Sequence, residues 1–251
     1  MADNQEAVRS SFSRQVGLFS GESSPFAGRG ANLAWLEPID AETVALEIAC
    51  GAAHVAQDLA PHVRAIVGID LTPELLTLGR DRLRDAGIDN VVLQEGDAQA
   101  LPFVDDSFDL VYCRASLHHF ADPARAVGEM VRVCRPGGQV TISDLVVPDP
   151  ELRDAFDGTH RLLDPSHMCA LTADELVATF PPTVGLAPPE QRASRMPLEA
   201  IVSELADRER LDARLQEEMD GGAPTGLVPG REDDAVIVEF ATCVIHATKA
   251  G

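Results

Sequence analysis

The sequence of 251 residues lacks the marks of a disulfide-rich, membrane-spanning or secreted protein. No apolar run approaches about 18 residues, so no membrane-spanning helix is expected. The first residues, MADNQEAVRSS, contain neither the basic nor the apolar segment of a secretory signal, and a cytoplasmic location is therefore expected. Cysteines are few and show no C-x-x-C spacing, which argues against a disulfide framework or a zinc knuckle; they stand at positions 50, 113, 134, 169 and 243.

Basic side chains are also scarce. The chain has 20 Lys and Arg against 41 Asp and Glu, which gives a formal net charge of −21. A surface this acidic repels phosphate backbones and anionic lipids, so neither a nucleic acid nor a membrane is expected as a partner. The hydrophobic content of 45% is sufficient for one domain with a large core, or for one domain and a lid.

Glycine is rare in a turn that would normally contain several. Residues 43–48 form a short apolar run typical of a strand buried on both faces. Residues 49–53 (ACGAA) contain nothing bulky, so a ligand could approach the backbone closely. A helix from residue 53 to about 60, stopped by Pro61, would point its free N–H groups at that ligand. Taken alone, this turn would fit a tightly packed strand-to-helix corner equally well.

A second strand strengthens the case for a binding site. Residues 65–70 are apolar and end in Asp70, nineteen residues after Gly51. A carboxylate at that strand end can accept hydrogen bonds from both hydroxyls of a ribose. Because Glu95-Gly96-Asp97-Ala98 then follows a third apolar segment, the sequence indicates a nucleotide-type site.

Five ordered segments carry a family resemblance across roughly residues 44 to 145: LEIACGAAHVA, IVGIDLTPELL, EGDAQALPFVDDSFDLVYC, SLHHFADPARAVGEMVRVCRPGG and GQVTISD. In order and spacing they resemble class I S-adenosylmethionine-dependent methyltransferases of the ubiquinone/menaquinone-biosynthesis type. The family's first loop usually carries more glycine. Here only Gly51 remains, and Ala49 and Ala53 stand at the other positions.

The alternation of strands and helices predicts right-handed βαβ units and a parallel sheet. The resemblance implies an α/β, doubly wound Rossmann-like fold with a seven-stranded sheet. That sheet would be mostly parallel, with an antiparallel C-terminal strand between the fifth and sixth strands, plus helical lid insertions. The implied domains are an N-terminal flap (1–40), a cofactor-binding core (41–145), lid insertions with one sheet strand (146–230) and the C-terminal strand completing the core sheet (231–251).

Apolar periodicity and turn residues give the individual elements. Strands are expected at about 43–49, 65–70, 90–95, 108–113, 138–144, 184–187 (extending toward 195) and 234–248. Helices are expected at about 6–19, 32–37, 53–60, 73–86, 122–134, 151–163, 172–180 and 197–219, with a loop at 21–30. Thr172 and Glu175 have the spacing of a capping box.

The resemblance implies S-adenosyl-L-methionine as the cofactor, held by a set of eleven residues: Gln15, Glu47, Ala49, Cys50, Gly51, Asp70, Leu71, Leu75, Asp97, Ala98 and Arg114. Asp70 would bind the ribose, although a helix-capping or solvated acid is the alternative. Asp97 and Ala98 would satisfy one donor and one acceptor of adenine, or form only an Asx turn. Leu71 and Leu75 would pack on the adenine.

The remaining cofactor contacts lie at the methionine end and on the flap. Glu47 would position the ammonium group, and Arg114 would hold the carboxylate unless it forms only a surface ion pair. Gln15, together with Phe12 and Phe19, would contact the cofactor from the N-terminal helix. The aromatic residues of that helix would equally serve to dock it on the core.

Histidines supply the candidates for chemistry. We expect one of His118, His119 and His167 to face the transferred methyl group, as a base or as an orienting contact. Since His118 and His119 are adjacent, only one of them should face the pocket if they lie on a helix. His160, Asp164 and His167 could share one face, but nothing completes a metal site there, so a helix end followed by a turn is favoured.

These residues favour a methyltransferase that acts on an O, N or C nucleophile of a small-molecule acceptor. Such a transfer requires mainly alignment and desolvation. A non-catalytic S-adenosylmethionine-binding protein on the same fold is the alternative. An NAD(P)-dependent oxidoreductase would share the turn and the ribose acid, but it gives no reason for the GDAQALPF segment or the terminal strand.

Overall fold

The computed structural model describes residues 2–20, 33–202 and 205–251. The loop expected at 21–30 therefore lies outside the described residues. Within the described part of the chain, nine strands form one sheet, whose main path has the order β3-β2-β1-β4-β5-β9-β6, with β7 and β8 also paired to β9. The strands are β1 (Val44–Ile48), β2 (Ala65–Asp70), β3 (Val91–Glu95), β4 (Phe108–Arg114), β5 (Cys134–Leu145), β6 (Val184–Leu186), β7 (Glu190–Pro197), β8 (Gly230–Glu232) and β9 (Ala235–Lys249).

The sheet confirms the predicted doubly wound architecture. Strands β1 to β5 are parallel neighbours, and β9 runs antiparallel between β5 and β6 as expected. The strand order reverses between β1 and β4, so the carboxyl ends of these strands border a crevice. This crevice is the place where open α/β sheets bind ligands.

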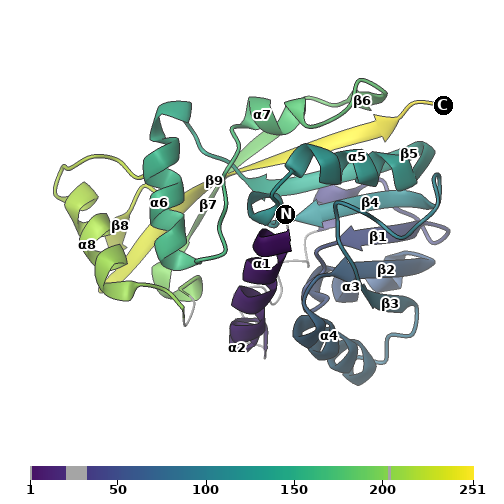
Figure 1. The fold of residues 1–251 in the computed structure, drawn as a ribbon, viewed down its shortest axis with the longest axis horizontal. Coiled ribbons are helices and arrows are strands. Elements are labelled where there is room, and N and C mark those ends of the chain that lie inside the picture. Colours follow the sequence, from purple (N-terminus) through teal and green to yellow (C-terminus); the bar gives the residue numbers. More distant parts are fainter. Residues whose placement is uncertain (1, 21–32, 203–204) are drawn as a thin grey trace.

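Helices cover both faces of the sheet (Figure 1). On one face α5 (Pro123–Val133) and α7 (Ala173–Ala178) pack against the strands. On the other face lie η1 (Leu33–Leu36), α3 (His54–Leu59), η2 (Ala60–His62) and α4 (Pro73–Asp85). The predicted capping box is confirmed, because Thr172 and Glu175 each bond the other's backbone N–H.

A second layer, which we call the cap, extends beyond this core. It consists of η4 (Pro150–Leu152), α6 (Arg153–Leu163), η5 (Leu198–Ala200), α8 (Arg208–Met219), β7, β8 and the first half of β9. The cap has its own hydrophobic cluster, which includes Phe156, Leu215 and Phe240. In Figure 1 it lies at the left, joined to the core through β9.

The prediction of one helix over 197–219 is wrong. The structure has β7 up to Pro197, then η5, and α8 begins only after Asp207, whose carboxylate accepts from Arg210 N. Leu211 and Leu215 share one face of α8, and Leu198 reaches the same buried cluster from η5. Elements η5 and α8 each pack separately against the hydrophobic cluster of the cap.

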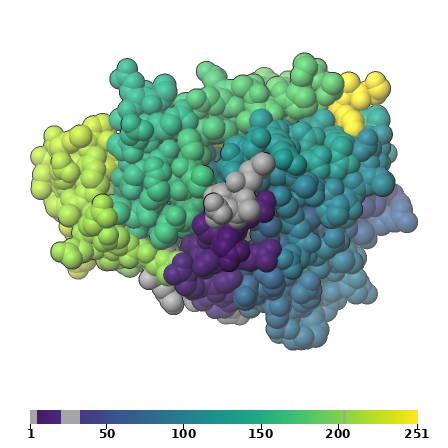
Figure 2. Space-filling model, viewed as in Figure 1, coloured from purple at the N-terminus to yellow at the C-terminus, as the bar shows by residue number. Residues whose placement is uncertain are grey.

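The N-terminal helix is also divided. The structure has α1 (Ala2–Arg14) and α2 (Val16–Phe19), separated by Gln15, which has φ −96° and ψ 9°. Figure 2 shows the N-terminal residues seated between the cap and the α/β core. Helix α1 therefore lies across the crevice that the strand ends border.

Candidate functional site

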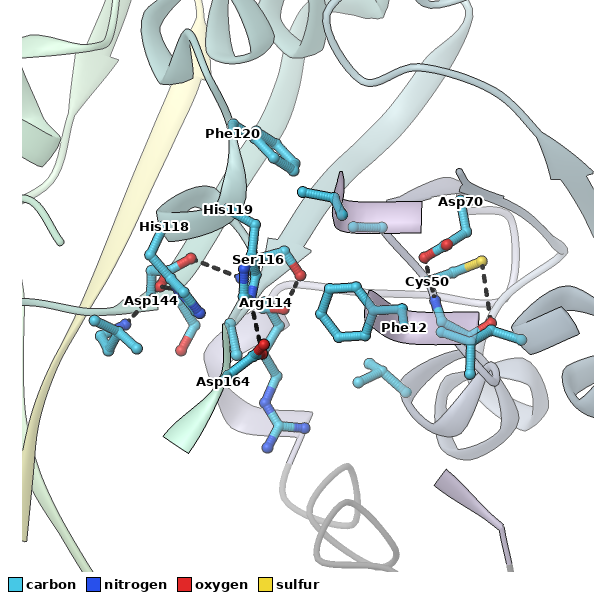
Figure 3. A pocket seen from close by; sticks show the side chains of 18 of the residues that line it. Phe12, Cys50, Asp70, Arg114, Ser116, His118, His119, Phe120, Asp144 and Asp164 are labelled. Atoms are coloured by element: carbon cyan, nitrogen blue, oxygen red, sulfur yellow. Dashed lines mark hydrogen bonds and ion pairs between the residues drawn. The ribbon is translucent and has the colours of Figure 1, made fainter. Parts of the chain in front are cut away.

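A cavity of about 550 Å³ opens between the core, the cap and α1. This volume is within the usual range for small-molecule sites. Figure 3 shows the ring of Phe12 in the middle, Asp70 and Cys50 on one side, and a group of histidines and aspartates on the other. The structure places all eleven predicted cofactor residues on the wall: Gln15, Glu47, Ala49, Cys50, Gly51, Asp70, Leu71, Leu75, Asp97, Ala98 and Arg114.

The turn after β1 adopts a left-handed backbone at alternate residues. Ala49, Gly51 and Ala53 have φ of 52°, 52° and 58°. Two of these residues are alanines, for which this conformation is costly. A Cβ atom added to Gly51 would meet only Leu75, at 4.0 Å, so the space beside this backbone belongs to the cavity.

Asp70 joins this turn to the end of β2. One carboxylate oxygen accepts from Gly51 N and the other from Thr72 N, each at 2.8 Å. Burial raises the pKa of Asp70, and these backbone N–H groups oppose that rise. Because a carboxylate has about four acceptor positions, each oxygen can still accept a further hydrogen bond from a ligand.

Glu47 is a buried carboxyl with no close cation among its hydrogen-bond partners. It is 4% exposed and accepts from the hydroxyl of Tyr112 at 3.1 Å. Burial raises its pKa to about 8, although the Tyr112 bond lowers it. A cationic ligand group placed beside Glu47 would favour the ionised form of this carboxyl.

The carboxylate of Asp97 accepts a hydrogen bond from a side-chain amide. Its Oδ2 accepts from Gln5 Nε2 at 2.6 Å, and its Oδ1 accepts from Gln99 N at 2.8 Å. The second contact is the Asx turn foreseen as the alternative. The first shows that the carboxylate also binds an amide N–H group brought by α1, so it is able to bind an amino group of a ligand.

The histidine side of the cavity begins with an Asp–His pair. His118 Nδ1 lies 2.6 Å from Asp144 Oδ1. Asp144 also accepts from the backbone N–H groups of Ser116, Leu117 and Leu145 at 2.7–2.8 Å. Burial alone would raise the pKa of Asp144, but His118 and these N–H groups hold it below its usual value. The fixed carboxylate orients the imidazole and leaves Nε2 for a ligand.

His119 also lines the cavity, so the expectation that only one of the two adjacent histidines faces it is wrong. Both belong to the 3₁₀ turn η3 (Leu117–His119), their ring centroids are 4.1 Å apart, and the cavity wraps around this single turn. His119 Nδ1 donates to Ser166 O at 3.1 Å, and Phe12 packs edge-on at 5.1 Å. Burial lowers the pKa of His119 to about 3, with the neighbouring His118 adding to the effect.

His167 lies behind this wall. It is 3% exposed, it is not among the described residues that line the cavity, and its Nε2 lies 2.6 Å from Asp157 Oδ1. His160, in contrast, does line the cavity and stacks on His167 with ring centroids 5.0 Å apart. His160 thus takes the place at the cavity that we expected for His167.

Asp144 was not predicted from the sequence, and no ligand contact was expected for His160 or Asp164. Asp144 could have been found, because it ends an apolar strand segment just as Asp70 does. His160 gave no such signal, since its position at the cavity depends on how the cap packs.

In residues 2–20, 33–202 and 205–251, no group of three or more His, Cys, Asp and Glu side chains is placed to hold a metal ion. Asp164 instead caps the end of α6, and His167 N bonds Asp164 O at 3.1 Å, as in the favoured helix end and turn. No helix in those ranges is long and apolar enough to cross a membrane.

Several known proteins that resemble this chain in sequence are described as methyltransferases. Residues 46–142 match a methyltransferase domain. The uncharacterized methyltransferase YcgJ of Bacillus subtilis is 38% identical over 141 residues, which cover 56% of each chain. A demethylmenaquinone methyltransferase of Listeria monocytogenes is 33% identical over 49% of this chain and 54% of the relative. The match thus spans just over half the length of these curated relatives.

Solved structures extend the likeness to nearly the whole chain. The crystal structure of YcgJ superposes with a TM-score of 0.77 at 27% identity, covering 88% of this chain and 98% of that one. A methyltransferase candidate from Bacillus halodurans C-125 gives 0.75 at 26% identity, covering 90% and 100%. The cap is therefore part of the shared structure as well.

Proposed function

Because this chain belongs to the class I S-adenosylmethionine-dependent methyltransferases, we propose that it transfers a methyl group to a small-molecule acceptor. The observation that carries this proposal is the division of one cavity into two chemically different sides. Asp70 and the turn after β1 form one side, and the Asp144–His118 pair forms the other. The first side suits the cofactor and the second suits the nucleophile.

The first side fits S-adenosyl-L-methionine. Asp70 retains acceptor positions for ribose hydroxyls, and the space beside Gly51 admits a ligand close to the backbone. Glu47 would face the ammonium group, and Arg114 would face the carboxylate. Asp97 would accept from the adenine amino group in place of the Gln5 amide. When bound, the cofactor supplies an electrophilic methyl group on a sulfonium.

The protein's own contribution is positioning and the handling of one proton. Phe12 and the buried surroundings of the cavity exclude water from the reacting atoms. His118 Nε2 accepts the proton of an O–H or N–H nucleophile while Asp144 stabilises the charged imidazole. His119 and Asp164 would orient the acceptor. An acceptor that loses no proton would use only the positioning.

The segments on either side of the cofactor-binding core complete the proposal. Residues 1–40 would act as a flap and 146–230 as lid insertions around a cofactor-binding core of residues 41–145. Strand 231–251 would complete the sheet of that core. This division is supported by the separate hydrophobic cluster of the cap and by the position of α1 across the cavity.

The test combines binding with turnover. We expect wild-type protein to bind S-adenosylhomocysteine in calorimetry, and Asp70→Ala to weaken binding by about 1–3 kcal/mol, because ribose hydroxyls lose their acceptor. Formation of S-adenosylhomocysteine should then be measured over a panel of phenols, amines and carbon acids. His118→Gln should lower kcat strongly with little change in cofactor affinity.

Each alternative predicts a different pattern. A non-catalytic binding protein would bind S-adenosylhomocysteine but would show no turnover with any acceptor in the panel. A nicotinamide-dependent oxidoreductase would bind NADH in preference to S-adenosylmethionine. Equal cofactor affinity of wild type and Asp70→Ala would remove the assignment of Asp70.

A further inference from the structure

His160 is a buried imidazole whose hydrogen bonding is incomplete. Its side chain comes from α6, outside the matched methyltransferase domain, and it lines the cavity while only 6% exposed. Among the described residues, Nε2 is the buried side-chain nitrogen or oxygen atom with no hydrogen-bond partner. Such an atom in a native structure requires an explanation, because leaving it unsatisfied is unfavourable.

The tautomer of this ring follows from its other nitrogen. Nδ1 lies 3.0 Å from the carbonyl oxygen of Phe156, one turn earlier in the same helix. A carbonyl oxygen only accepts hydrogen bonds, so Nδ1 carries the proton. Burial and the neighbouring His167 lower the pKa of His160 well below its usual value, so the ring is neutral. Nε2 is therefore a lone-pair acceptor.

Within the part of the chain that the structure describes, no donor bonds to His160 Nε2. The ring packs between Phe156, with centroids 4.2 Å apart, and His167 at 5.0 Å, and it lies 5.6 Å from Phe240. The cap side of the cavity has apolar residues such as Ile201 and Leu163, and it also has Arg192 and Ser194, neither of which bonds to His160 Nε2. The nearby polar wall atoms of Asp164 are themselves acceptors. The missing donor must therefore come from a molecule in the cavity, either water or a ligand.

We propose that His160 Nε2 binds a hydroxyl or N–H group of the methyl acceptor, at a point remote from the atom that is methylated. The inference rests on the proposed function. The rings of His118 and His160 both pack on His167, with centroid distances of 5.4 and 5.0 Å. The two histidines therefore lie on the same side of the cavity and can bind the same ligand. The methyl acceptor is then a largely apolar small molecule with a second hydrogen-bond donor. An analogue in which an ether oxygen replaces that donor should bind the protein more weakly.

The test uses phenol and its methyl ether, anisole, as probes that share a ring and an oxygen atom, but only the oxygen of phenol carries a hydrogen-bond donor. With ¹⁵N-labelled histidine, the His160 ring should show a protonated Nδ1 and a free Nε2. Phenol should shift the Nε2 resonance and anisole should not. We expect phenol to bind wild-type protein roughly tenfold more tightly than it binds His160→Phe, which removes the acceptor but keeps the ring.

Two further variants make the result decisive. His160→Gln, whose amide oxygen can accept, should recover part of the phenol affinity, whereas the exposed-site control His62→Gln should leave it unchanged. Equal phenol affinity in wild type and His160→Phe, or a proton on Nε2, would overturn the inference. S-Adenosylhomocysteine titrated into the same samples tests the proposed function separately, since its binding does not involve His160.

Discussion

Glu47 is a buried acid whose pKa lies far above its ordinary value. Its carboxyl sits at the carboxyl end of β1 with a folded-state pKa of about 8, because burial disfavours the charge. Between roughly pH 4.5 and pH 8 the folded protein therefore holds a proton that the unfolded chain has released. The free energy of unfolding must decrease as pH rises through this interval.

Glu47→Gln should abolish this decrease of the unfolding free energy with pH, because glutamine stays neutral and still accepts a hydrogen bond from Tyr112. We expect the variant to gain stability over wild type on the order of 1–3 kcal/mol between pH 5 and pH 8. Urea denaturation of the ligand-free proteins at both pH values measures the difference. A difference that stays constant with pH would show that Glu47 is ionised throughout.

At the scale of single elements, the turn after β1 has alanines in a backbone conformation that favours glycine. Ala49→Gly should raise the free energy of unfolding by about 0.5–1 kcal/mol, because the strain of a Cβ atom at φ 52° disappears. Ala52 lies in the same turn but is not among the residues with positive φ, so Ala52→Gly is the matched control and should destabilise. Thermal denaturation of the two variants compares them, and the same sign for both would contradict the strain argument.

Helix α1 contacts the core through three polar side chains as well as through Phe12. Gln5, Arg9 and Ser13 bond to Asp97, Glu95 and Glu74 at 2.6–2.8 Å. The last two of these contacts are exposed, and such contacts contribute little stability.

Hydrogen exchange should therefore be faster in α1 than in α5, whose apolar face is fully buried in the core. S-Adenosylhomocysteine should slow exchange in α1 and leave α5 unchanged. If α1 is as protected as α5 in the ligand-free protein, this helix is not a separable element.

At the scale of the whole molecule, several histidines have lowered pKa values, and three of them, His119, His160 and His167, are buried together. Burial lowers the pKa of His54 and His167 to about 4 and that of His119 to about 3, and His160 lies well below its usual value. Below about pH 6.5 the unfolded chain binds protons at these sites that the folded protein does not. Stability is thus present above this pH and is lost as the pH falls toward 4.

Each of these histidines should contribute up to about 1.4 kcal/mol per pH unit to that loss. His160→Phe should make the acid dependence of the unfolding free energy shallower by about one proton between pH 6 and pH 5. Urea denaturation of both proteins at the two pH values gives the slopes. Identical slopes would mean that His160 is not neutral in the folded protein.

Much of the core was predictable because its signals are local. The strands around Glu47 and Asp70 are continuous apolar runs, and each ends at a residue that the parallel sheet brings to one edge. The turn, the acid and the Asp97 segment therefore meet at the cavity whatever the remainder of the chain does.

The strands and side-chain positions of the cap could not be predicted from local sequence patterns in the same way. The strand expected at 184–187 and toward 195 is divided into β6 and β7. Strand β7 is mostly exposed and polar without a clear alternation, and its pairing with β9 defines it. The side chain of His160 reaches the cavity because α6 packs on Phe240 and Leu215, which are distant in sequence. Such positions depend on tertiary packing, and a local pattern does not contain them.

Strand β9 determines how small molecules enter and leave. Its residues 242–248 pair with β5 and residues 237–244 pair with β7, so one continuous ladder holds both walls of the cavity. Swinging the cap away would break that ladder, whereas displacing α1 breaks only side-chain contacts. The residence time of a bound molecule is accordingly set by the rate at which α1 detaches. Salt weakens the ion pair between Arg9 of α1 and Glu95, so added salt should shorten this residence time.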